Sequence, residues 1–108
     1  KDMIKTGGEN VAPAEVEAVV ASHDSVDMAA VVGVPDERWG ELVVAFVTPA
    51  SGASIDPDVL DAFCRERLAG FKVPRRWHVV DDLPRTASGK VQRAKLRAAA
   101  TSSRAGDH

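Results

Sequence analysis

A lysine near the C-terminal end of the chain stands in a sequence context suited to binding an anion. Lys90 follows the turn-forming residues Thr-Ala-Ser-Gly and precedes an amphipathic stretch, within the run Pro-Arg-Thr-Ala-Ser-Gly-Lys-Val-Gln-Arg-Ala-Lys-Leu at 84–96. Gly89 permits a close approach of the backbone, and the hydroxyls of Thr86 and Ser88 can hydrogen-bond the turn. The run therefore predicts a lysine held toward an anion, with a plain surface turn as the alternative.

The same run does not match the phosphate-binding loop of nucleoside triphosphatases. That loop needs a glycine five residues before the Gly-Lys pair and a serine or threonine after it. This chain has Pro84 and Val91 at those two places. Any contact between Lys90 and a phosphate must therefore use another architecture.

Two further groups in predicted turns could contact a ligand. Gly7 and Gly8 form the turn of a hairpin predicted over 3–11, since glycine accepts positive φ freely. Trp39 lies in a predicted loop, and the turn at 70–74 reads Gly-Phe-Lys-Val-Pro. Two arginines follow that turn and could meet phosphates. The alternatives are an ordinary hairpin and an aromatic lid on a small core.

The elements that must position these groups follow from apolar spacing and from helix start signals. Asp56 followed by Pro57 predicts an N-cap and the first helical residue. The inward face of that helix is predicted to include Val59 and Cys64, and Gly70 is predicted to end it. The fold class is α+β, with a small, mostly antiparallel three-stranded sheet, flanking helices and an N-terminal β-hairpin. Strands are predicted at 26–34, 41–48 and 77–80, and helices from Pro13, at 56–70 and from Val91.

The bulk properties fit one compact domain with an aliphatic core. The chain has 108 residues, of which 44% are apolar and 5% aromatic. It lacks the ~20-residue apolar stretch of a transmembrane helix, and no signal peptide is visible. The single cysteine, Cys64, predicts a buried thiol and excludes an internal disulfide. His23, His78 and His108 lack metal-binding spacing, so we expect no metal site.

Charge is distributed unevenly along the chain. Residues 1–74 carry a net charge of −7 and residues 75–104 carry +6, within a total of −2. A basic C-terminal third suggests a polyanionic ligand, or else a solvated helix rich in arginine. Nucleic-acid binding is disfavoured, because aromatic residues are not interleaved with the basic ones.

The runs at 84–96 and 8–17 resemble two motifs of the C-terminal domain of adenylate-forming enzymes, the acyl-CoA synthetase family, and the chain is most similar to bacterial acid–CoA ligases. The resemblance covers residues 1 to about 97, and it implies that residues 1–100 form the mobile C-terminal domain, with 101–108 as a disordered tail. It also implies that a large N-terminal domain outside this chain makes most of the contacts to ATP and Mg²⁺ and contains the pocket for the acid.

The resemblance assigns roles to individual residues. It implies that Lys90 is the catalytic lysine of adenylation and that Lys1 and Asp2 form the interdomain hinge. In some relatives that use CoA, the residue at the position of Trp39 stacks on the adenine of CoA, and the resemblance implies the same role for Trp39. The residues implied to bind CoA or its pantetheine arm are Lys5, Gly7, Gly8, Glu9, Trp39, Phe71 and Lys72. The turn departs from some relatives at Val73, where they carry a basic residue, so its contact with CoA stays open.

The implied parent enzyme is a cytoplasmic, ATP-dependent acid–CoA ligase, and the chain alone should not turn over. Its partners would be its own large domain, a carboxylic acid, ATP and CoA, with no nucleic acid and no membrane span. A lysine acetyltransferase acting at Lys90 is a further implied partner. The alternatives are an adenylation domain of a peptide synthetase, which serves a carrier protein, and a non-catalytic anion- or nucleic-acid-binding module.

Overall fold

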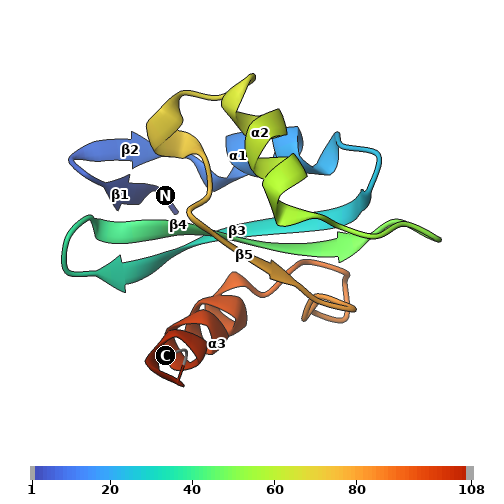
Figure 1. Ribbon diagram of the computed structural model, residues 1–108. Helices are drawn as coiled ribbons and strands as arrows, with labels where there is room; N and C mark the ends of the chain where they lie inside the picture. Colours follow the sequence, from blue (N-terminus) through green and yellow to red (C-terminus); the bar gives the residue numbers. More distant parts are fainter. Residues whose placement is uncertain (1, 107–108) are drawn as a thin grey trace.

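Within residues 2–106, the part of the chain that this computed structural model describes, two helices cover one face of a sheet and a third covers the other (Figure 1). The layers therefore read helix, sheet, helix. The elements are β1 (Ile4–Thr6), β2 (Glu9–Val11), α1 (Pro13–Ala21), β3 (Val26–Asp36), β4 (Gly40–Pro49), α2 (Pro57–Arg65), the 3₁₀ turn η1 (Gly70–Lys72), β5 (Arg76–Val79) and α3 (Arg93–Gly106).

The α+β class is confirmed, but the sheet is larger than predicted. Its order is β2-β1-β4-β3, with β5 also paired to β4, so the described chain forms five strands rather than three. The N-terminal hairpin is not separate, because Thr6 of β1 pairs with Gly40 of β4. The β3–β4 pair is antiparallel, whereas β5 runs parallel to β4. Short apolar runs do not reveal which strands become neighbours, which is why the sequence missed this extension.

Both faces of β3 and β4 are buried, and their alternating side chains build two cores. One core lies beneath α1 and α2, and includes Val31, Val43 and Leu60. The other lies against α3, and includes Val32 and Leu96. Each strand therefore reads as a continuous apolar run, as expected for a strand covered on both sides.

Several predicted helix boundaries were wrong. The Asp56 carboxylate caps α2 by accepting from the amide of Asp58 at 2.9 Å, as predicted, but α2 ends at Arg65 rather than at Gly70. Val59 is 48% exposed, so its predicted inward position is also wrong. Its neighbours Leu60 and Cys64 are fully buried, so the apolar stripe of α2 is narrower than the residue types suggest.

The last helix starts later than predicted. Val91 forms an isolated bridge with Arg85, and α3 begins at Arg93. The helix continues to Gly106, past the Thr101 boundary at which the sequence predicts a tail. No helix in the described part of the chain is both long and apolar enough to cross a lipid bilayer.

Candidate functional site

The loop before α3 is ordered by a set of short-range hydrogen bonds centred on Thr86. The Thr86 amide donates to the Lys90 carbonyl oxygen at 2.8 Å, and the Gly89 amide donates to the Thr86 carbonyl oxygen at 2.8 Å. The Thr86 hydroxyl oxygen accepts from the Lys90 amide at 3.2 Å and lies 3.0 Å from the Ser88 hydroxyl oxygen. Gly89 has φ of +92°, a value that suits glycine. The turn is therefore held by hydrogen bonds of its own residues, as the sequence predicted.

Lys90 itself is exposed, and within the described residues its ammonium makes no ion pair. The nearby Arg85 differs, because its guanidinium is paired with Asp82 at 3.0 Å. The backbone of the loop is therefore held in place while the cation of Lys90 is left free to meet an anion.

The glycine turn of the N-terminal hairpin packs on Trp39. Gly7 and Gly8 have φ of +57° and +84°, and the Gly7 amide donates to the Trp39 carbonyl oxygen at 2.8 Å. A Cβ atom added at Gly7 would stand 3.1 Å from the ring of Trp39, whereas one added at Gly8 would meet nothing within 4 Å. Gly7 is thus needed for both its backbone angle and its contact with the indole.

The guanidinium of Arg75 covers the same indole, with its central carbon 3.9 Å from the ring centroid of Trp39. Sequence reasoning placed Arg75 near a phosphate but did not foresee this cation–π contact, which joins segments 36 residues apart. Arg38 lies farther from the ring, at 5.5 Å. Gly7, Trp39 and Arg75, together with Gly8, form one cluster, which we call the glycine-turn cluster.

The other residues that the resemblance assigns to CoA binding are not part of the glycine-turn cluster. Phe71 is half-buried and packs against the core beneath α1 and α2. The Lys72 ammonium is paired with Glu15 of α1 at 2.9 Å. Lys5 is exposed, and its amide donates to the Glu41 carboxylate at 2.8 Å. Glu9 is exposed at the start of β2.

Of the two predicted hinge residues, only Asp2 is among the described residues. Lys1 lies outside the described residues. Asp2 is exposed and lines a small pocket of about 210 Å³ together with Arg93, the first residue of α3. The start of the described chain and the start of the last helix are therefore neighbours.

The Lys90 loop and the β1–β2 turn lie at opposite ends of the molecule (Figure 1). The loop follows β5 at one end of the sheet, and the hairpin extends from the other. The two predicted sites are therefore not neighbours within the described domain.

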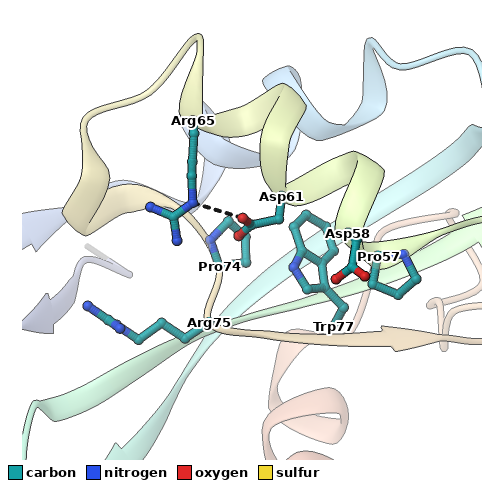
Figure 2. A pocket seen from close by; sticks show the side chains of 7 residues that line it. All are labelled: Pro57, Asp58, Asp61, Arg65, Pro74, Arg75 and Trp77. Atoms are coloured by element: carbon teal, nitrogen blue, oxygen red, sulfur yellow. Dashed lines mark hydrogen bonds and ion pairs between the residues drawn. The ribbon is translucent and has the colours of Figure 1, made fainter.

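A second cavity, of about 270 Å³, lies between α2 and β5. Figure 2 shows Trp77 pointing from β5 toward α2 and Arg75 extending away from it. Asp58 and Asp61 line this pocket, and Asp61 is paired with Arg65 at 2.8 Å. Arg65 and Arg75 line it as well, so the charges of its lining side chains balance and do not favour an anion.

His23, His78 and Cys64 pack within the fold. The imidazole of His23 contacts Phe63 edge-on at 4.9 Å, and that of His78 stacks on Phe46 at 4.8 Å; His108 lies outside the described residues. Burial raises the pKa of the Cys64 thiol to about 11. Among the described residues, no three His, Cys, Asp or Glu side chains gather closely enough to hold a metal ion.

The basic residues of the C-terminal third do not form one open stripe. Arg93 is paired with Glu17 at 2.7 Å, and Arg97 donates to the Gly33 carbonyl oxygen at 3.2 Å. Contacts of this kind occupy cations that a nucleic acid would need. The structure therefore gives no further support to the alternative of an anion- or nucleic-acid-binding module.

Comparison with known proteins places the chain in a family. The family model described as the AMP-binding enzyme C-terminal domain matches residues 15–90. The chain is 55% identical over 96 residues to the 2-succinylbenzoate–CoA ligase of Geobacillus kaustophilus, a match that covers 89% of this chain and 20% of that protein. It is 50% identical over 97 residues to the fatty acid–[acyl-carrier-protein] ligase ScoC of Streptomyces coeruleorubidus, covering 90% and 19%.

Solved structures agree with the sequence comparison. MatB from Rhodopseudomonas palustris superimposes with a TM-score of 0.90 at 41% identity, over 94% of this chain and 20% of MatB. The chain thus spans about a fifth of the length of the curated relatives it matches. It belongs to the AMP-binding enzyme C-terminal domain family, whose members here are parts of acid–CoA ligases and related adenylate-forming enzymes.

Proposed function

We propose that this chain is the mobile C-terminal domain of an ATP-dependent carboxylic acid–CoA ligase and that its two ends serve two successive steps. The first step joins the acid and ATP to form acyl-AMP and pyrophosphate. The second transfers the acyl group to the thiol of CoA and releases AMP. The observation that carries the proposal is the exposed Lys90 ammonium, held on an ordered loop and unpaired within the described residues.

The chemistry of the first step suits a lysine in this position. A carboxylate oxygen attacks the α-phosphorus of ATP, and the bond to pyrophosphate breaks. Negative charge gathers on the phosphoryl oxygens, and a positioned cation stabilises it. The ordered loop would hold that cation where the two reacting anions meet, which adds to the rate by orientation.

The second step would use the glycine-turn cluster. Rotation about the hinge at Lys1 and Asp2 would remove Lys90 from the site and bring Gly7 and Gly8 to it. Glycines there let the backbone lie close to the pantetheine arm. Trp39 would offer its indole to the adenine, which requires Arg75 to move aside or to stack with the base. Lys5, Glu9, Phe71 and Lys72 would lie around this channel, with Lys72 first leaving Glu15.

The large domain would supply what this chain lacks. The described residues hold no cluster of carboxylates for Mg²⁺, so the metal would reach the site bound to ATP and to the large domain. The acid pocket would also lie there, and the large domain would therefore choose the acid. ATP and CoA are cytoplasmic metabolites, and we place the enzyme in that compartment.

A carrier protein is the second candidate acceptor. The fatty acid–[acyl-carrier-protein] ligase that is 50% identical to this chain motivates it. A carrier presents the same pantetheine thiol but no adenine, so Trp39 would lose its proposed partner. Comparing CoA with a pantetheinylated carrier protein in the second step distinguishes the two.

Lys90 is also a candidate for regulation by acetylation. Its side chain is exposed, so an acetyltransferase could reach it. Acetylation removes the positive charge, and the first step would then slow, as we expect for Lys90→Ala. Mass spectrometry of the parent protein from growing cells, together with an exchange assay, tests this.

The test of the main proposal is Lys90→Ala in the intact parent enzyme. Acid-dependent ATP–pyrophosphate exchange should fall about 100- to 1000-fold, the range for loss of one preorganised electrostatic contact. Thioester formation from pre-made acyl-AMP and CoA should stay within a few-fold of wild type. Lys95→Ala is the matched control, because Lys95 is exposed on α3 near the same loop. Normal exchange in Lys90→Ala would contradict the proposal.

A further inference from the structure

A partly buried ion pair joins the two helical layers around the edge of the sheet. The Glu17 carboxylate of α1 accepts from Nε and Nη2 of Arg93, at 3.0 Å and 2.7 Å. The Glu17 and Arg93 side chains are 17% and 29% exposed, which makes them the most buried ion pair in the described chain. This two-pronged contact is the strongest geometry that a guanidinium and a carboxylate can adopt.

The same carboxylate caps the outer edge of β3. The Val31 amide donates to Glu17 Oε2 at 2.8 Å. Two residues further along the strand, the Gly33 carbonyl accepts from Arg97 at 3.2 Å. Side chains of α1 and α3 thus satisfy edge groups that would otherwise be open to another strand. One carboxylate, that of Glu17, ties together α1, β3 and α3.

Local helix preferences do not explain why arginine opens α3. A cation in the first turn of a helix opposes the helix dipole, and the first turn of α3 contains no acidic residue. The hydrogen bond to Glu17 raises the pKa of Arg93 above its usual range, and the charge of Asp2 acts in the same direction. The place of Arg93 is therefore decided by α1 and by the N-terminal segment.

The Lys90 loop is attached directly to this helix start. The Gln92 amide donates to the Pro84 carbonyl at 2.8 Å, which closes the base of the loop one residue before Arg93. Arg85 and Val91 bridge across the loop just above that base. A shift at the start of α3 would consequently carry Lys90 with it.

We infer that the Glu17–Arg93 pair positions Lys90 for adenylation, an inference that rests on the function proposed above. The pair fixes the start of α3, and with it the Lys90 loop, to α1 and to the segment that holds Asp2. Asp2 and Arg93 line the same small pocket. The predicted hinge and the catalytic loop are thus held in one spatial relation by a contact 76 residues apart in the sequence. Arg93 and Glu17 are positioning residues, since neither is proposed to touch a substrate.

The test compares both steps in the intact parent enzyme carrying Arg93→Gln, Glu17→Gln or Arg93→Lys. Arg93→Gln should lower kcat for acid-dependent exchange about tenfold to a hundredfold, the effect of a small misplacement of a catalytic group. The KM values for acid and ATP should stay within about twofold, because the large domain binds them. Thioester formation from acyl-AMP and CoA should be nearly unchanged. Arg93→Lys should lower kcat less than Arg93→Gln does, since lysine keeps the positive charge but cannot make the two-pronged contact of a guanidinium.

Cys64→Ala is the control for a general loss of stability. Cys64 is a fully buried residue of α2 in the core beneath α1 and α2, on the face of the sheet opposite to α3. An equal fall of both steps in Arg93→Gln, or a fall in Cys64→Ala as selective and as large, would overturn the positioning role. Normal exchange in Lys90→Ala would instead overturn the proposed function, so the two failures are distinguishable.

Discussion

The two ends of this domain are ordered in different ways. The Lys90 loop is held by hydrogen bonds among its own neighbours, from Thr86 to Gln92. The glycine-turn cluster is assembled from three distant segments, those of Gly7, Trp39 and Arg75. A short motif can thus specify a local turn, whereas a binding surface made of separate segments depends on the sheet that joins them.

Gly7→Val should have the largest effect on the glycine-turn cluster while sparing the Lys90 loop. Valine in the left-handed region costs roughly 1–2 kcal/mol, and its Cβ would stand 3.1 Å from the Trp39 ring. Thioester formation from acyl-AMP and CoA should fall about 100-fold, as expected for a site displaced by about 1 Å, and exchange should be nearly normal. Both rates are measured in the intact parent enzyme.

Gly52→Val is the matched control for Gly7→Val. Gly52 also has positive φ, at +77°, but a Cβ there would meet nothing within 4 Å. The control carries the backbone strain without the clash, and both steps should stay near wild type. If Gly7→Val and Gly52→Val behave alike, the contact with Trp39 has no role in the second step.

Trp39→Ala should weaken the use of CoA without affecting adenylation. Stacking of a base on an aromatic ring contributes about 1–3 kcal/mol, so the KM for CoA should rise about tenfold or more. Trp39→Phe should recover much of the loss, because it keeps a ring against Gly7 and Arg75. An unchanged KM for CoA in Trp39→Ala would contradict the proposed stacking of Trp39 on the adenine.

Thr86→Val should produce a smaller loss, confined to the first step. The change keeps the shape of the side chain but removes the oxygen that accepts from the Lys90 amide. A single hydrogen bond contributes about 1 kcal/mol, so exchange should fall about fivefold. Thr101→Val is the control, since its hydroxyl donates to the Arg97 carbonyl within α3. A fall in thioester formation of equal size would mean that the two ends are not independent.

The smallest expected effect is that of Cys64→Ala on the pH dependence of stability. The reactivity of the Cys64 thiol also reports whether the domain stays folded. Burial raises its pKa from the ordinary 9.0 to about 11. The free energy of unfolding should therefore be unaffected by this thiol below pH 9 and should fall as the pH rises toward 11. Cys64→Ala should remove that part of the pH dependence in denaturant titrations. At pH 8, the thiol should react as slowly in the Lys90 and Gly7 variants as in wild type; fast labelling would reveal unfolding instead.

Much of the fold could be predicted from local signals. Pro13 and the Asp56–Pro57 pair marked helix starts, and the apolar runs around Val31 and Val44 marked the central strands. Helix ends were harder, because α2 stops at Arg65 without the glycine that was expected to end it. The place of the hairpin in the sheet could not be read, since its contact with β4 rests on the Thr6–Gly40 pairing.

The candidate site divides in the same way. The Lys90 turn was predictable, because Thr86, Ser88 and Gly89 hydrogen-bond or bend within a few residues of it. The partner of Lys72 was not, because Glu15 lies 57 residues away and nothing local pairs the two. Arg75 on Trp39 was missed for the same reason.

The sequence by itself determined the family, the α+β class, the Lys90 turn and the glycine turn, because each depends on residue types that are close together in the chain. The tertiary structure alone decided that the two turns lie at opposite ends of the sheet (Figure 1), and that Glu17 holds Arg93 across the edge of β3. Both facts depend on how the strands align, and strand alignment is set by the packing of the whole core rather than by any local run of residues.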